Sequence, residues 1–170
     1  MLACKIFSLL VASAGIVFLL IALVTDYWLV AYGPRYINHS GLWQECLDGK
    51  CITEDAPDGY ILATRAFLIL AALVASITVI CLLASFTPSI HVLRGAFIAS
   101  IAAFVAGLCT FIAIAVFTAE SWNKDVGPQI QCTYQWSFYL GCTAFPMLLL
   151  AGIFSLVAHL CSPTASYESI

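Results

Sequence analysis

The chain has 170 residues, of which 63% are hydrophobic and only 9% are charged. Soluble domains contain roughly 45–50% apolar and about 25% charged residues, so this composition excludes an ordinary soluble globular protein. The formal net charge of −3 leaves no basic surface for nucleic acid, which excludes that class of partner. The length allows one domain, and most of it is expected to lie in a lipid bilayer.

Four long stretches carry no Asp, Glu, Lys or Arg. They cover about residues 6–25, 66–86, 95–119 and 137–160. About 20 residues of helix cross the roughly 30 Å hydrocarbon layer, so each stretch can span it. Lipid admits only helices or closed barrels, and the alternation of a barrel strand is absent. The sequence therefore predicts a single all-α, four-span membrane domain over residues 1–170. The alternative for the first stretch is a cleaved signal peptide, but its apolar part is too long and no convincing cleavage site follows it.

The spans place outer loops at 26–65 and 120–136, with a short tail at 161–170 on the side of the N-terminus. Lys and Arg are distributed too evenly to settle the orientation. The first loop holds the glycosylation sequon Asn38-His39-Ser40 and the pair Cys46 and Cys51. Glycans and disulfides are added on the lumenal or extracellular side. We therefore expect a glycan on Asn38 and cytosolic termini.

The two loop cysteines flank a predicted hairpin turn, Asp48-Gly49. Leu47 and Lys50 would form the pair next to the turn, and Cys46 and Cys51 would then face each other at a non-hydrogen-bonded position. That spacing suits a disulfide, with free thiols or an incomplete metal knuckle as alternatives. The composition of 27–30 and 41–43 indicates further strands, so the loop is expected to form a small antiparallel sheet.

All four tryptophans fall in or beside the outer loops: Trp28, Trp43, Trp122 and Trp136. This one-sided belt indicates anchoring at the outer membrane interface. The alternative is that Leu42 and Trp43 dip from the sheet into the membrane edge. Asp26 and Arg65 both lie at the outer boundary, and we expect them to form an ion pair.

Several of these residues follow one another in a specific order: Trp28, Gly41-Leu42-Trp43, Cys46, Cys51 and Arg65. Along the whole chain, this pattern resembles the superfamily of claudins, peripheral myelin protein and epithelial membrane proteins. The resemblance implies a four-helix bundle with a small extracellular or lumenal sheet from the first loop. Within the superfamily, the branch found in natural killer cell granules is the most similar, through residues 22–28, 39–43, 128–131, 136–141 and 167–170. The lens fibre branch is a near second, through 46–51 and 63–67.

Deep in the spans there is no Asp, Glu, Lys, Arg or His, so a pump or a proton-coupled transporter is not expected. His39, His91 and His159 are scattered, and they indicate neither a metal site nor a catalytic set. We therefore expect no enzyme activity, no cofactor and no small-molecule substrate.

The cysteines outside the spans and the C-terminal tail suggest how the protein is modified and sorted. Cys4 and Cys161 lie at the cytosolic membrane edge and are candidate palmitoylation sites, with unmodified thiols as the alternative. Cys132 is the odd outer cysteine, either buried against the sheet or available for an intermolecular bridge. The tail ends in Tyr167-Glu168-Ser169-Ile170, a Tyr-x-x-aliphatic pattern that clathrin adaptors bind as an extended peptide. A PDZ ligand is the rival interpretation, since Ile170 ends the chain.

Two functions follow from these features. The resemblance to the granule branch implies a non-enzymatic tetraspan of lysosome-related cytotoxic granules. Such a protein would support granule trafficking, exocytosis and lymphocyte cytotoxicity through lateral contacts with other membrane proteins. The alternative is a claudin-type or lens-type junctional protein of the plasma membrane.

Overall fold

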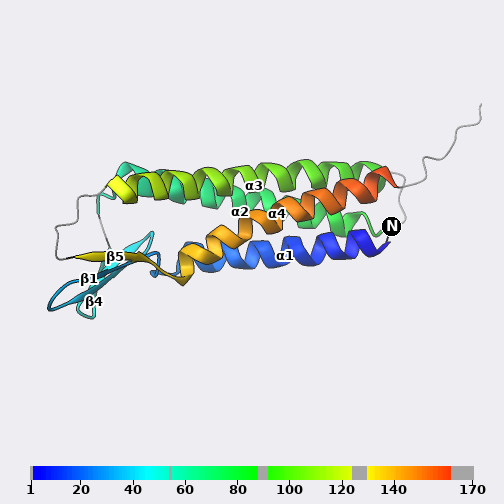
Figure 1. Ribbon diagram of the computed structural model, residues 1–170. Coiled ribbons are helices and arrows are strands. Elements are labelled where there is room, and N and C mark those ends of the chain that lie inside the picture. The colour runs from blue at the N-terminus through cyan, green and yellow to red at the C-terminus, as the bar shows by residue number, and fades with distance from the viewer. Residues whose placement is uncertain (1, 54, 88–91, 124–129, 162–170) are drawn as a thin grey trace, which may run out of the picture.

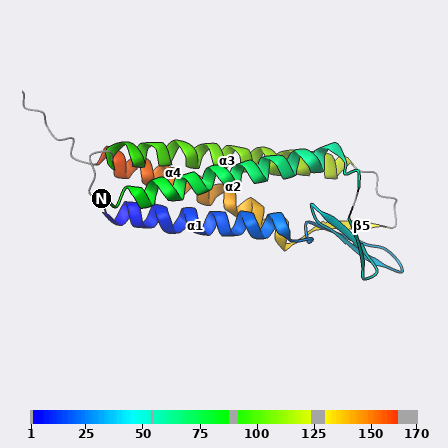
Figure 2. The same cartoon turned by 180° about the vertical axis from the view of Figure 1, so that it is seen from behind.

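The computed structural model describes residues 2–53, 55–87, 92–123 and 130–161. Within them, four helices are long and apolar enough to cross a membrane. They lie side by side as a bundle in both views of the ribbon (Figures 1 and 2), which confirms the predicted all-α tetraspan class. Their bounds are α1 (Leu2–Val24), α2 (Gly59–Ala84), α3 (Val92–Asn123) and α4 (Trp136–Leu160).

Two helices extend well beyond the charge-free stretches. The 32 residues of α3, at about 1.5 Å each, give a length of about 48 Å, which exceeds the roughly 30 Å hydrocarbon layer. At its start, α2 has six residues before Arg65. Helical geometry does not require lipid, so the helices continue past the apolar stretches by which the sequence defines a span. The first residues of α2 and the last residues of α3 lie at the end of the bundle that carries the sheet (Figure 1).

Small residues and hydroxyl groups hold the helices together. Ala99 and Ala103 on α3 are fully buried, and a Cβ on Gly107 would lie 3.2 Å from Leu149 of α4. Two serines donate hydrogen bonds between helices: Ser8 to the carbonyl of Ala151 at 2.7 Å and Ser155 to that of Ala96 at 2.8 Å. In lipid, where burial of apolar surface gives no drive between helices, close packing and such hydrogen bonds take its place.

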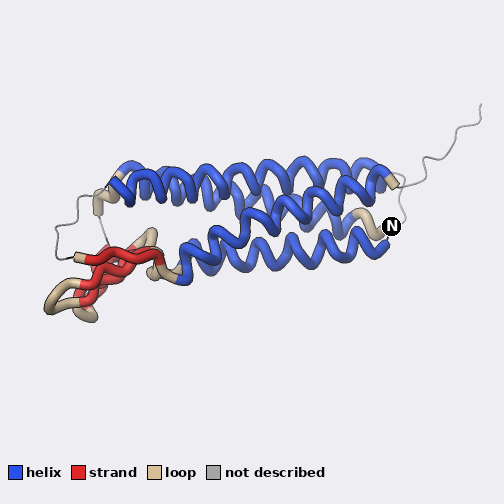
Figure 3. Tube along the Cα trace, in the orientation of Figure 1, coloured by secondary structure: helices blue, strands red, loops and turns tan. Residues whose placement is uncertain are grey.

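The outer loops form one five-stranded sheet at the end of the bundle (Figure 3). Four strands come from the first loop: β1 (Leu29–Tyr32), β2 (Ile37–Ser40), β3 (Gln44–Leu47) and β4 (Lys50–Thr53). The fifth, β5 (Gln131–Tyr134), comes from the second loop and pairs with β1, so the order is β4-β3-β2-β1-β5 with antiparallel neighbours. The predicted sheet is confirmed, but the sequence did not indicate that the second loop adds a strand.

The hairpin between β3 and β4 has the predicted register. Asp48 and Gly49 both have positive φ, 50° and 80°, and Leu47 pairs with Lys50 beside them. Cys46 and Cys51 face each other and form the disulfide. The predicted strand at 41–43 is wrong, because the amide of Gly41 donates to the carbonyl of Gln44 at 2.9 Å and closes a turn between β2 and β3.

The sheet and the N-terminus lie at opposite ends of the bundle (Figures 1 and 2). The last residues of α4, drawn red in Figure 1, end beside the N-terminus. The sheet therefore lies on one side of any membrane that the bundle spans. Which side is cytosolic remains a prediction.

Candidate functional site

The carbonyls at the end of α1 accept hydrogen bonds from outside the helix. The last four carbonyls of a helix have no partner within it. Here Thr25 donates its amide to Ile21 at 3.1 Å, Trp28 donates its indole Nε1 to Ala22 at 2.6 Å, and Trp43 donates Nε1 to Leu23 at 2.7 Å. Two tryptophans of the sequence motif are therefore side-chain caps of α1, and they hold the first loop on the bundle.

Trp28 is completely buried, at 0% exposure, so its assignment to an interfacial belt is wrong. Its ring packs edge-on against Phe117 of α3 and Phe138 of α4, with centroids 4.8 and 5.8 Å away. Its amide donates to Ser40 at 3.0 Å, and its carbonyl accepts from Gln135 at 3.1 Å. The residue therefore joins the bundle to both outer loops.

Gly41 and Leu42 shape the turn beside it. A Cβ on Gly41 would collide with the Asp26 backbone and lie 2.6 Å from its Oδ1, so only glycine fits there. Leu42 is buried in the core at 1% exposure and does not dip into the membrane edge. Trp43 stays 39% exposed beside it, where an interfacial anchor is expected.

Arg65 contacts this turn from α2. Its Nε donates to the carbonyl of Leu42 at 2.6 Å, and the guanidinium lies 4.6 Å from the centre of the Trp43 ring. The expected ion pair with Asp26 is wrong, since Arg65 is bound to the turn instead. The Asp26 Oδ1 is buried and has no hydrogen-bond partner within the described part of the chain. Its burial raises the pKa of Asp26, and the charge that His39 can carry opposes that rise.

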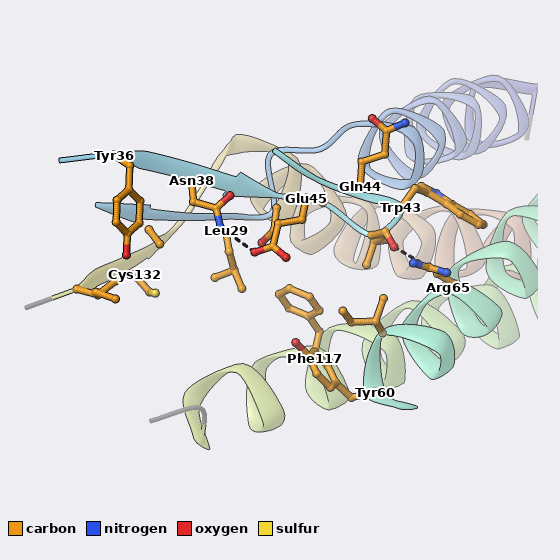
Figure 4. A pocket seen from close by; sticks show the side chains of 16 residues that line it. Leu29, Tyr36, Asn38, Trp43, Gln44, Glu45, Tyr60, Arg65, Phe117 and Cys132 are labelled. Atoms are coloured by element: carbon orange, nitrogen blue, oxygen red, sulfur yellow. Dashed lines mark hydrogen bonds between the residues drawn. The ribbon is translucent and has the colours of Figure 1, made fainter. Parts of the chain in front are cut away.

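A cavity of about 270 Å³ lies between the sheet and the outer ends of α2 and α3. One face of the sheet supplies Leu29, Asn38 and Glu45, while Tyr60 and Phe117 come from the helices (Figure 4). The strand register places Leu29, Ser40 and Glu45 in one row across three strands, which explains why they share this face. The lining thus combines aromatic rings with a carboxylate, and Arg65 is also part of it.

The sequon residue Asn38 is half-buried and lines this cavity. Its Nδ2 donates to Glu45 Oε1 at 2.7 Å, drawn as a dashed line in Figure 4, and its Oδ1 is buried with no partner among the described residues. A glycan on Nδ2 would have to leave through the cavity and disturb that hydrogen bond. Glycosylation of Asn38 remains a prediction, and it would require the glycan to leave through the cavity.

The opposite face of the sheet carries the disulfide. His39, Cys46 and Cys51 are consecutive across β2, β3 and β4, and their ligand atoms lie within 4.8 Å of one another. Because both sulfurs form the disulfide, they are not thiolates, and a metal would find only the His39 ring in this group. That ring stacks on Tyr27, with centroids 4.6 Å apart.

The other candidate residues are far from this region or outside the described residues. Cys4 lies near the start of α1 and Cys161 directly after α4, both at the end opposite the sheet. Cys132 on β5 is an exposed free thiol, not a buried one. The sorting residues Tyr167 and Ile170 lie outside the described residues.

Comparison with known proteins agrees with this geometry. The sequence pattern of the PMP-22/EMP/MP20/Claudin family matches residues 1–155. The human Protein NKG7 is 40% identical over 168 residues, covering 98% of each chain, and the mouse Protein NKG7 is 38% identical with the same coverage. The human lens fiber membrane intrinsic protein is 32% identical over 155 residues, covering 89% of each chain.

Proposed function

This chain belongs to the PMP-22/EMP/MP20/Claudin family, and from that membership we propose that it is a tetraspan of lysosome-related granule membranes. It would support granule trafficking, exocytosis and lymphocyte cytotoxicity through lateral contacts with other membrane proteins, without catalysis. The observation that carries the proposal is the similarity to Protein NKG7 over 98% of both chains. A match over 168 of the 170 residues extends into the tail after α4.

The proposal includes an orientation. The sheet with its disulfide would face the granule lumen or the cell exterior, because disulfides persist in those compartments. The opposite end, with Cys4 and Cys161, would then face the cytosol, where both cysteines would accept palmitate. The tail would also be cytosolic, within reach of a clathrin adaptor.

The tail motif supplies the mechanism of sorting. Tyr167 and Ile170 would fill two pockets of a clathrin adaptor as an extended peptide. Phosphate on Tyr167 would add a charge of about −1.5 to −2 to a ring that must be buried, and would block binding.

The experiment compares the location of wild type and Tyr167→Ala, with the tag at the N-terminus so that Ile170 remains free. Wild type should overlap a lysosomal marker, while Tyr167→Ala and Ile170→Ala should move to the plasma membrane at unchanged expression. Ser166→Ala, beside the motif but outside its two anchor positions, is the matched control and should stay in granules.

A junctional role is the second candidate, favoured by the 32% identity to the lens fiber membrane intrinsic protein. It predicts that wild type concentrates at cell–cell borders and that Tyr167→Ala has little effect. Wild type at borders and absent from lysosomes would replace the granule proposal with this one.

A further inference from the structure

The cavity between the sheet and the helix ends is lined by groups of both charges. Glu45 enters it from β3, and Arg65 enters it from α2 (Figure 4). Among the described residues, the Glu45 carboxylate accepts one hydrogen bond, from Asn38, and has no cation beside it. Within the described part of the chain, the guanidinium of Arg65 makes one hydrogen bond, through Nε to Leu42, so its two Nη groups remain as donors.

Aromatic side chains belong to the lining of this cavity, and Tyr60 and Phe117 lie across it from Glu45 (Figure 4). Tyr36, Tyr60 and Phe117 belong to its lining, and Trp43 lies at the end where Arg65 enters. Aromatic faces attract cations, above all quaternary ammonium groups that carry no hydrogen-bond donors. The buried Oδ1 of Asn38 adds a further partial negative charge without a partner in the described chain.

The size and position of the cavity limit its ligand. Pockets for drug-sized ligands measure roughly 300–1,000 Å³, so a cavity of about 270 Å³ suits a smaller group. It lies where α2 begins and where α3 continues beyond its apolar stretch, which is the level of the membrane interface. Lipid headgroups are the small molecules most concentrated at that level.

We propose that this cavity binds the phosphocholine headgroup of a membrane lipid. The trimethylammonium would lie beside the Glu45 carboxylate and face Tyr60 and Phe117 across the cavity. The phosphate would accept hydrogen bonds from the Nη groups of Arg65. Neither a purely anionic nor a purely cationic headgroup would bind both the Glu45 carboxylate and the Arg65 guanidinium. Binding at this site does not depend on where in the cell the protein resides, so the two proposals are tested separately.

A glycan on Asn38 would occupy the same space, so the proposal applies to the protein whose Asn38 is unmodified. The test therefore uses full-length protein made without N-glycosylation and purified in a maltoside detergent. The soluble probes are phosphocholine, glycerol phosphate, which lacks the cation, and choline, which lacks the phosphate. Binding is measured by isothermal titration or by saturation transfer. Phosphocholine should bind about tenfold or more tightly than either single-charge probe, which corresponds to about 1.4 kcal/mol.

Glu45→Gln is the decisive variant, because Gln keeps an acceptor for Asn38 but loses the charge. It should weaken phosphocholine binding by about tenfold with an unchanged melting temperature. Glu120→Gln, on an exposed residue of α3 outside the cavity lining, should bind as wild type. Equal binding of phosphocholine by wild type and Glu45→Gln would overturn the assignment.

The lipid itself is tested in nanodiscs that contain equal amounts of phosphatidylcholine and phosphatidylglycerol. After gentle extraction, native mass spectrometry should find phosphatidylcholine retained on wild type and depleted on Glu45→Gln. Retention of both lipids in equal amounts would exclude a lipid headgroup as the ligand. If soluble phosphocholine still bound in that case, the ligand would be a free phosphocholine ester.

Discussion

The hydrogen bond from Trp28 to the end of α1 should make a larger contribution to stability than the matching bond from Trp43. Phe in place of Trp28 removes the donor to Ala22, and that acceptor has no water to replace it because the site is fully buried. An unsatisfied buried acceptor costs about 1–3 kcal/mol. The smaller ring also leaves a void against Phe117 and Phe138. Together these effects should lower the free energy of unfolding by about 2–4 kcal/mol.

Trp43→Phe removes the same kind of donor from Leu23, but at a site that is 39% exposed. Water or headgroups can replace the indole there, so the loss should stay near 1 kcal/mol. The assay heats detergent-solubilised protein and follows the monodisperse peak by size exclusion, which avoids a readout from tryptophan fluorescence. Trp122→Phe, at 81% exposure, is the control and should melt as wild type. Equal losses for Trp28→Phe and Trp43→Phe would refute the capping argument.

Three further predictions concern the outer loops. Cys46→Ser should leave Cys51 open to alkylation in unreduced protein and reduce delivery to granules or the cell surface. If both cysteines of native wild type react with a membrane-impermeant maleimide, the disulfide is absent in cells. Asn38→Gln should abolish a glycosidase-sensitive gel shift, and a wild-type protein without that shift in mammalian cells would remove this support for the lumenal sheet. Burial raises the pKa of Asp26 in the folded chain above its value in the unfolded chain. The protonated carboxyl therefore favours the folded state in acid, and this contribution to the free energy of unfolding is lost as the pH rises through the folded pKa. Asp26→Asn should therefore raise the melting temperature at neutral pH more than in acid, whereas an equal shift at both would contradict that sign.

The sequence predicted the parts of the fold that local physics determines. The charge-free stretches indicated four helices because lipid leaves few other structures available. The hairpin was predictable in register because Asp48-Gly49 specifies its turn and thereby brings Cys46 opposite Cys51. Both signals lie within a few residues of the structure that they predict.

The errors concern contacts between distant segments. The four residues of β5 have no pattern of their own, and they become a strand because β1 offers an unpaired edge. A tryptophan after a helix is equally consistent with an interfacial anchor and with a cap, and only packing shows that Trp28 is buried. Opposite charges at one boundary suggested that Asp26 and Arg65 would pair, but the free carbonyl of Leu42 lies nearer the guanidinium. The cavity depends on all these contacts together, so no local pattern could indicate it.

The position of the sheet depends on where α1 ends. Trp28 and Trp43 donate to two consecutive carbonyls of that end, Ala22 and Leu23, while Arg65 attaches the intervening turn to α2. A shift of α2 along α1 would therefore break either an indole hydrogen bond or the bond to Leu42. The same three side chains fix the distance between the sheet and the ends of α2 and α3, and that distance defines the cavity. The tryptophan and arginine motif of this chain thus determines the shape of the outer cavity as well as the stability of the bundle.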